Sequence, residues 1–151
     1  MNIFLDTSAL VKFYHEEEGT ASITAQILDC DGDIYISELA KLEIISSFCR
    51  RFRNKEIDED AYQEALEAFR EDLPRYKLVP VTHQVLKTAE MILLDLAPTT
   101  GLRALDALHL ATFTLGSSSD SLFVAADKIL LQAAEAIGAN TYNPTITLNQ
   151  E

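Results

Sequence analysis

The segment that decides the fold is residues 3–14, which read IFLDTSALVKFY. Its first three residues are apolar, an acid follows at once, and a helical pattern comes after the acid. A short apolar run bounded by polar residues predicts a buried strand. Asp6 stands where an N-cap is favoured, ahead of a helix over residues 7–14. The segment therefore predicts a strand that passes directly into a helix, with a carboxylate at the junction.

The same alternation of strand and helix continues to the end of the chain. Strands joined by helices pair in parallel, because a parallel crossover needs a dozen or more residues. We therefore predict an α/β fold, a three-layer α/β/α sandwich around a central, mostly parallel sheet. One domain is expected over residues 1–143, with a polar tail at 144–151. The further predicted strands are 33–36, 76–81, 122–125 and 140–142, the helices are 19–30, 38–54, 58–73, 82–97, 103–115 and 127–138, and 98–101 is a turn.

Composition narrows the class of protein. The 151 residues are 48% hydrophobic, which excludes a disordered chain, and the formal charge is −12. No apolar stretch approaches the roughly 20 residues of a membrane span, and the N-terminus lacks a basic signal-peptide region. Cys30 and Cys49 lack metal-binding spacing, so we interpret them as buried thiols of a cytoplasmic protein. The negative charge predicts weak non-specific binding of nucleic acid.

Three acids occupy positions where a carboxylate could either stabilise the fold or bind a ligand. Asp6 and Asp127 follow predicted strands, and ligands of open α/β sheets bind at the carboxyl ends of strands. Either acid could equally be a helix N-cap. Asp106 lies in a helix that is apolar around nearly its whole circumference, so we expect that helix to be buried. Arg103, His109 or a metal ion could compensate its charge equally well.

Glu43 lies in the middle of the helix predicted over residues 38–54. It could pair with Arg50 on a solvated face, or it could face the sheet edge, with Ser47 and Arg50 beside a ligand. We expect the buried arc of this helix to contain Leu42, Ile45, Phe48, Cys49 and Phe52.

Four carboxylates gathered at one place would repel one another. Hard divalent cations such as Mg²⁺ or Mn²⁺ take oxygen ligands and remove that repulsion. Such ions suit phosphoryl transfer, where they activate water and stabilise developing charge. His15, His83 and His109 lack the spacing of zinc ligands. His109 is better interpreted as a core residue or as a support for the ligands.

Four sequence blocks together resemble a PIN domain of the VapC toxin type. The first is FLDTSALVKFY at residues 4–14, with the acidic turn that follows it. The second is ISELAKLE at 36–43, the third is LRALDALHLA at 102–111, and the fourth is FVAAD at 123–127. Their order and spacing span residues 3 to about 142.

The resemblance implies a metal-dependent endoribonuclease, the toxin of a toxin–antitoxin pair. Asp6, Glu43, Asp106 and Asp127 match the acidic quartet that binds one or two Mg²⁺ or Mn²⁺ ions and activates water for attack on an RNA phosphodiester. Thr7 or Ser8 matches the hydroxyl that helps hold the site, while Ala125 replaces the Ser or Thr common in relatives. The resemblance also implies a homodimer and a small antitoxin whose C-terminal segment covers the acidic groove.

Two other interpretations remain open. An inactive PIN-like module would only bind a protein partner, although all four acids are present. A phosphohydrolase of small phosphate esters is the second, but the haloacid-dehalogenase type needs an Asp where Ser8 stands.

Further charged and apolar residues have plain structural interpretations. Residues 16–18 are expected to form a solvated acidic loop. The basic residues of 50–55 form either a cationic last helical turn or a local patch that contacts phosphate or an antitoxin. Tyr62, Leu66 and Phe69 are core or dimer surface.

Overall fold

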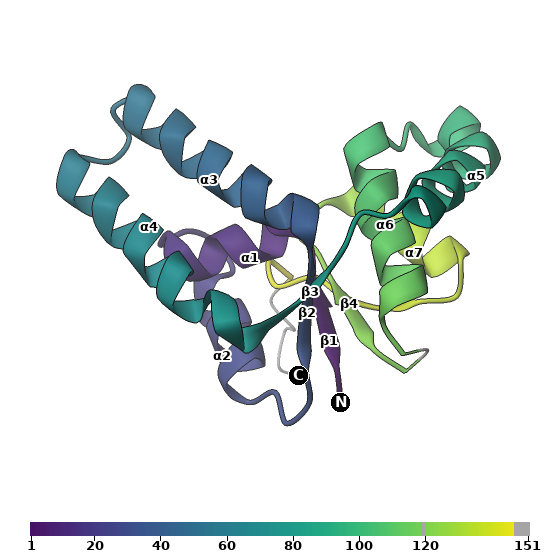
Figure 1. Ribbon diagram of the computed structural model, residues 1–151, viewed down its shortest axis with the longest axis horizontal. Coiled ribbons are helices and arrows are strands. Elements are labelled where there is room, and N and C mark those ends of the chain that lie inside the picture. The colour runs from purple at the N-terminus through teal and green to yellow at the C-terminus, as the bar shows by residue number, and fades with distance from the viewer. Residues whose placement is uncertain (119, 147–151) are drawn as a thin grey trace.

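The protein, seen here in a computed structural model that describes residues 1–118 and 120–146, has a five-stranded sheet with helices on both faces (Figure 1). Strand order is β3-β2-β1-β4-β5, and every neighbouring pair is parallel. The predicted α/β/α class is therefore confirmed. The strands are β1 Ile3–Leu5, β2 Ile34–Ser37, β3 Tyr76–Val79, β4 Leu122–Val124 and β5 Asn140–Tyr142.

The helices divide into two layers. Four of them lie on one side of the sheet and three on the other (Figure 1). The first layer holds α1 Thr7–Tyr14, α2 Thr20–Leu28, α3 Glu38–Arg53 and α4 Glu59–Asp72, which the 3₁₀ turn Leu73–Arg75 follows. The second layer holds α5 His83–Thr100, α6 Ala104–Gly116 and α7 Lys128–Ala136. Within the described residues, no helix is long and apolar enough to cross a membrane.

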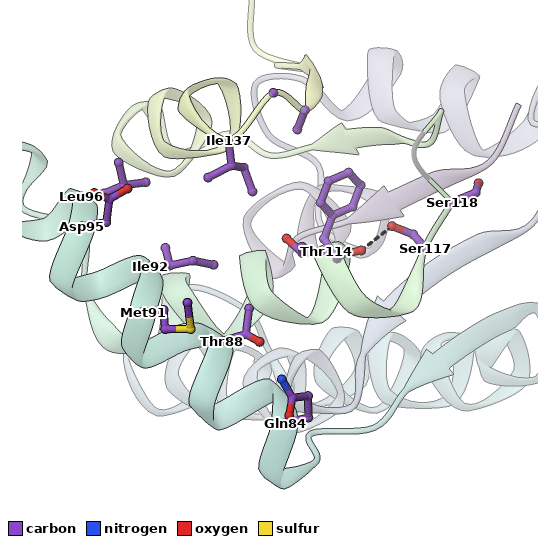
Figure 2. Close-up of a pocket in the computed structure, with 13 residues that line it drawn as sticks. Gln84, Thr88, Met91, Ile92, Asp95, Leu96, Thr114, Ser117, Ser118 and Ile137 are labelled. Atoms are coloured by element: carbon purple, nitrogen blue, oxygen red, sulfur yellow. Dashed lines mark hydrogen bonds between the residues drawn. The ribbon is translucent and has the colours of Figure 1, made fainter.

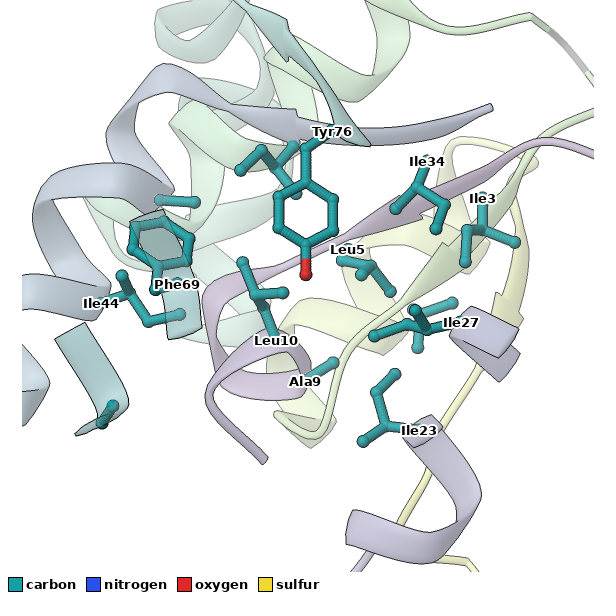
Figure 3. Close-up of a cluster of buried hydrophobic side chains, with 14 of the residues drawn as sticks. Ile3, Leu5, Ala9, Leu10, Ile23, Ile27, Ile34, Ile44, Phe69 and Tyr76 are labelled. Atoms are coloured by element: carbon teal, nitrogen blue, oxygen red, sulfur yellow. The ribbon is translucent and has the colours of Figure 1, made fainter. Parts of the chain in front are cut away.

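Two hydrophobic cores lie on opposite faces of the sheet because neighbouring strand residues point in opposite directions. Ile3 and Leu5 of β1 belong to the core under the first layer, where Figure 3 shows them beside Ile34. Phe4, between them, belongs to the core under the second layer and stacks on Phe123 at 5.7 Å. β1 is thus buried on both faces, as its all-apolar sequence predicts.

The predicted turn at residues 98–101 is wrong, because α5 continues through Pro98 to Thr100. Pro98 lacks an N–H donor, but the Thr100 hydroxyl donates to the Leu96 carbonyl at 2.7 Å and stabilises this last turn. Gly101 then ends the helix with a left-handed φ of 73°. α5 therefore contains a proline in its last turn and ends at Gly101 rather than before Pro98.

The expected solvated loop at residues 16–18 is wrong for Glu17. This carboxylate lies 3.1 Å from the Lys12 ammonium and 2.8 Å from the Arg51 guanidinium. Although burial alone would raise the pKa of Glu17, those two cations lower it. Glu17 therefore joins α1, the following loop and the end of α3.

A pair of tyrosines, of which Tyr76 is buried and Tyr14 half-buried, joins α1 to β3. The Tyr14 hydroxyl lies 2.6 Å from that of Tyr76 and donates to the Asp72 carboxylate at 3.0 Å. Burial raises the pKa of Tyr76 to about 12 and raises that of Tyr14 as well. Both phenols are therefore kept neutral in the folded protein.

The chain after β5 returns to the first helical layer. Pro144 is buried, and its carbonyl packs against Gly19, which adopts a φ of +92°. Residues 144–146 of the expected tail are described in the structure, whereas 147–151 lie outside the described residues.

Candidate active site

A cavity of about 610 Å³ opens at the carboxyl edge of the sheet, between α1, α3 and α6. All nine residues predicted for the site line it, and Leu42, Leu105, Val11 and Ser46 complete the wall. The sheet order explains this convergence, because β1 and β4 are neighbours and end at the same edge. The predicted site residues are the acids Asp6, Glu43, Asp106 and Asp127, with Thr7, Ser8, Ser47, Arg50 and Arg103.

Asp6 and Asp127 serve as helix N-caps while they line this cavity. Asp6 is almost fully buried and accepts a hydrogen bond from the Ser8 backbone N–H at 3.0 Å. Asp127 accepts one from the backbone N–H of Leu130 at 2.9 Å. The two interpretations of these acids are therefore compatible, since capping uses only part of each carboxylate and fixes its position.

The Ser8 hydroxyl connects the two strand ends. It donates to the Asp6 carboxylate and accepts a hydrogen bond from the Ala126 backbone N–H at 3.0 Å. Ala125, which has no hydroxyl, is completely buried. The bridge between the two halves of the site is thus made by a side chain of α1.

Asp106 sits at the exposed start of α6. The expectation that this helix is buried throughout is wrong for its first turn, since Ala104 and Leu105 are exposed and the core contacts begin at Ala107. Burial, together with the charges of Asp6 and Asp127, raises the pKa of the Asp106 carboxyl. Arg103 Nε lies 3.8 Å from Asp106 and opposes that rise only in part. The negative charge of Asp106 is therefore only partly balanced by the cations around it.

Glu43 is held by two neighbours from other elements. Its Oε1 accepts a hydrogen bond from the Thr7 hydroxyl at 2.9 Å and another from His109 Nε2. Burial alone would raise the pKa of Glu43, but the hydrogen bond and charge of His109 lower it. The alternative in which Glu43 pairs with Arg50 is wrong, because no ion pair joins them within the described chain.

His109 lies between two acids of the site. Its side chain is 1% exposed, and Nδ1 lies 3.5 Å from Asp6 Oδ1 while Nε2 contacts Glu43. Burial alone would lower the pKa of His109, but the Asp6 charge and the Glu43 contact raise it. Among the described residues, His109 Nδ1 has no hydrogen-bond partner. The interpretation as a ligand support therefore agrees with the position of His109.

The chemistry of the donors fits a hard divalent cation, although the acids are not drawn together around one point. Within residues 1–118 and 120–146, no three His, Cys, Asp or Glu side chains are arranged to hold a metal ion. The His109 ring lies between two of the acids, Asp6 and Glu43. The raised pKa of Asp106 marks excess negative charge that a cation would offset.

Two exposed leucines flank the acids and were missed by the sequence pattern. Leu42 is 68% exposed and Leu105 is 51% exposed. The arc predicted for α3 is confirmed at Phe48, which is buried, but it is wrong at Leu42, Cys49 and Phe52, which are exposed. The helix buries Ala40 and Ile44 in their place. Helical periodicity cannot distinguish an apolar residue that faces a cavity from one that faces the core.

A larger cavity, of about 840 Å³, lies between α5, α6 and α7 (Figure 2). Its wall is mostly apolar, with Met91, Ile92 and Ile137 among the residues labelled in the figure. Asp95 is the one acid among the residues that line it. This cavity therefore lacks the clustered charges that hydrolytic chemistry needs.

Comparison with solved structures shows similar folds at low sequence identity. FitAcB from Neisseria gonorrhoeae is 19% identical with a TM-score of 0.73, over 95% of this chain and 98% of that one. A toxin–antitoxin complex from Klebsiella pneumoniae is 13% identical with a TM-score of 0.66, over 94% and 97%. DNA-bound VapBC from Salmonella typhimurium is 16% identical with a TM-score of 0.64, over 95% and 98%. A comparison with curated proteins finds no match.

The family comparison covers most of the chain. The PIN domain family matches residues 3–136, which include all four acids of the site and the whole sheet except β5. The predicted resemblance is thereby confirmed, and the chain belongs to the PIN domain family.

Proposed function

We propose that this protein is a metal-dependent endoribonuclease and the toxin of a toxin–antitoxin pair. The observation that carries the proposal is the convergence of Asp6, Glu43, Asp106 and Asp127 on one cavity at the carboxyl edge of the sheet. Membership of the PIN domain family supports hydrolysis of a nucleic acid backbone, and the similar folds from toxin–antitoxin complexes support the toxin role. The prediction that both thiols are buried is wrong, since Cys30 is half-buried and Cys49 is exposed. Both are free, however, and free thiols support a cytoplasmic location.

The four acids would hold one or two Mg²⁺ or Mn²⁺ ions. A bound ion of this kind lowers the pKa of a water molecule and stabilises charge on the phosphoryl oxygens. Ser8 fixes Asp6, and Thr7 fixes Glu43, so two of the carboxylates are already oriented.

Two cations on the cavity rim suit the negative backbone of RNA. Arg50 comes from α3 and Arg103 precedes α6, so they approach the cavity from different elements. The side chain of Arg103 is 81% exposed and can reach a phosphate without losing a buried contact. Ser47 lies on the same wall and offers a hydroxyl to the substrate.

The cavity also suits an antitoxin segment that carries basic and apolar residues. Its acids would attract cations, while exposed Leu42 and Leu105 would receive apolar side chains. Of the residues considered for a dimer surface, Leu66 and Phe69 are buried in the core. Homodimerisation is better supported by α5, where Leu86, Met91 and Leu94 are exposed.

The test is cleavage of an RNA oligonucleotide with Mn²⁺, with EDTA, and with a small phosphate ester in place of RNA. We expect RNA cleavage that EDTA abolishes, no turnover of the ester, and a loss of at least about 100-fold in Asp106→Asn. Activity that persists in EDTA would contradict the metal mechanism. RNA cleavage by Asp106→Asn at the wild-type rate would contradict the assignment of the acids.

A further inference from the structure

His109 is a buried side chain that contacts two of the four acids, Asp6 and Glu43, and is not itself a predicted metal ligand. Its ring is 99% buried in α6, and its two nitrogens face different elements, Asp6 after β1 and Glu43 on α3. A ring in that position has a fixed orientation, because the close-packed core leaves it no room to turn.

Glu43 needs such a partner because of where it is attached. It projects from the middle of α3 with three rotatable side-chain bonds, and its side chain is 26% exposed. The hydrogen bonds from Thr7 and His109 end on the same atom, Oε1. They leave Oε2 free as a ligand.

We propose that His109 is a positioning residue for the divalent cation, one that acts through Glu43 by donating from Nε2 to the Glu43 carboxylate. This inference rests on the proposed metal-dependent function and deepens it. Hydrogen bonds to ligating carboxylates are typical of protein metal sites, and their loss lowers metal affinity about 10–100-fold. The Nδ1 side of the ring, which is 3.5 Å from Asp6 and makes no hydrogen bond among the described residues, is the less important one.

Two substitutions test the contributions of Nε2 and Nδ1 separately. The amide of a glutamine reaches about as far as Nε2 of histidine, whereas the shorter asparagine reaches only as far as Nδ1. His109→Gln therefore keeps a donor for Glu43, and His109→Asn keeps one for the Asp6 side. His15→Gln is the matched control, because His15 is also buried and packs edge-on against Phe48 at 4.8 Å, away from the acids.

The experiment is titration calorimetry with Mn²⁺ on each variant of the full chain, after circular dichroism has shown that it is folded. We expect His109→Asn to bind Mn²⁺ about 10–100-fold more weakly than the wild type, with His109→Gln and His15→Gln close to the wild type. We also expect that His109→Asn causes no further loss in a Glu43→Gln background, since both changes disable one carboxylate.

Equal Mn²⁺ affinity of the wild type and His109→Asn would overturn the role of His109 and leave the metal site standing. A greater loss in His109→Gln than in His109→Asn, or additive losses with Glu43→Gln, would also overturn it. A wild-type protein that binds no Mn²⁺ would instead overturn the proposed metal site, and this inference with it.

Discussion

The Ser8 hydroxyl offers the clearest single test of how the site is held together. Ser8→Ala removes a donor from the Asp6 carboxylate and leaves the Ala126 N–H without its acceptor. A donor left unpaired costs about 1–3 kcal/mol, and a hydrogen bond to a charged group contributes about 1.5–3 kcal/mol. Both values are reduced here, because Ala126 is only half-buried and Asp6 keeps the Ser8 backbone N–H. We therefore expect the free energy of unfolding to fall by about 2 kcal/mol.

Urea denaturation followed by circular dichroism measures this loss directly. The midpoint should fall while the slope m is unchanged, because the surface exposed on unfolding is the same. In a thermal scan the same loss lowers Tm by about 4–8 °C for a chain of this length. Ser47→Ala is the control, since Ser47 lines the same cavity and makes no side-chain hydrogen bond within the described chain. A Ser8→Ala midpoint equal to that of the control would refute the bridge.

Three more perturbations are expected to give clear results. Because the pKa of Asp106 is raised, its ionised form destabilises the metal-free fold at pH values above the ordinary pKa of an aspartate, so Asp106→Asn should raise the urea midpoint at pH 7. The same change should remove the stability that Mn²⁺ adds to the wild type, about 2.7 kcal/mol when the Mn²⁺ concentration is 100 times Kd. Equal midpoints of wild type and variant without metal would argue against this. Gly116→Ala should lower the free energy of unfolding by about 1–3 kcal/mol, because the new Cβ would lie 2.2 Å from Val79 Cγ1. Adding Val79→Ala to the same chain should recover part of that loss when the two single variants and the double variant are compared by denaturation. Raising the pH from 10 to 12 should lower the free energy of unfolding by about 1.4 kcal/mol per pH unit for each tyrosine whose pKa is raised. The stability that a neutral phenol contributes is complete below pH 10 and is lost as the pH rises to the pKa of the phenol in the folded protein. Tyr76→Phe should show a shallower fall of stability with pH, and a slope equal to that of the wild type would contradict the pairing of Tyr14 with Tyr76.

The fold was predictable because local and long-range signals agree. The three central strands β1, β2 and β4 are short, mostly apolar runs, and capping residues such as Ser37 and Asp58 mark where helices begin. The end of α5 was not predictable in the same way. Proline favours a helix stop, and only the structure reveals the threonine hydroxyls that hold the last turn together.

The gathering of the acids was predictable, but their partners were not. Asp6 and Asp127 follow strands, so topology alone brings them to one edge. The contact between Glu43 and His109 joins residues 66 positions apart, and neither helical pattern indicates it. Side-chain pairing across elements depends on how α3 and α6 pack, which periodicity within one helix does not encode.

The central place of β1 also has a consequence for the time at which the site forms during synthesis. β1 is made before the other four strands, yet one of its two neighbours in the sheet is β4, which follows it more than a hundred residues later. About 120 residues separate Asp6 from Asp127, so at about 5–20 residues per second the last acid follows the first by about 6–24 s. A nascent or prematurely ended chain that lacks β4 leaves one edge of β1 unpaired and the carboxylate cluster incomplete. The cell that makes this protein therefore meets a complete site only after β4 and Asp127 have been synthesised.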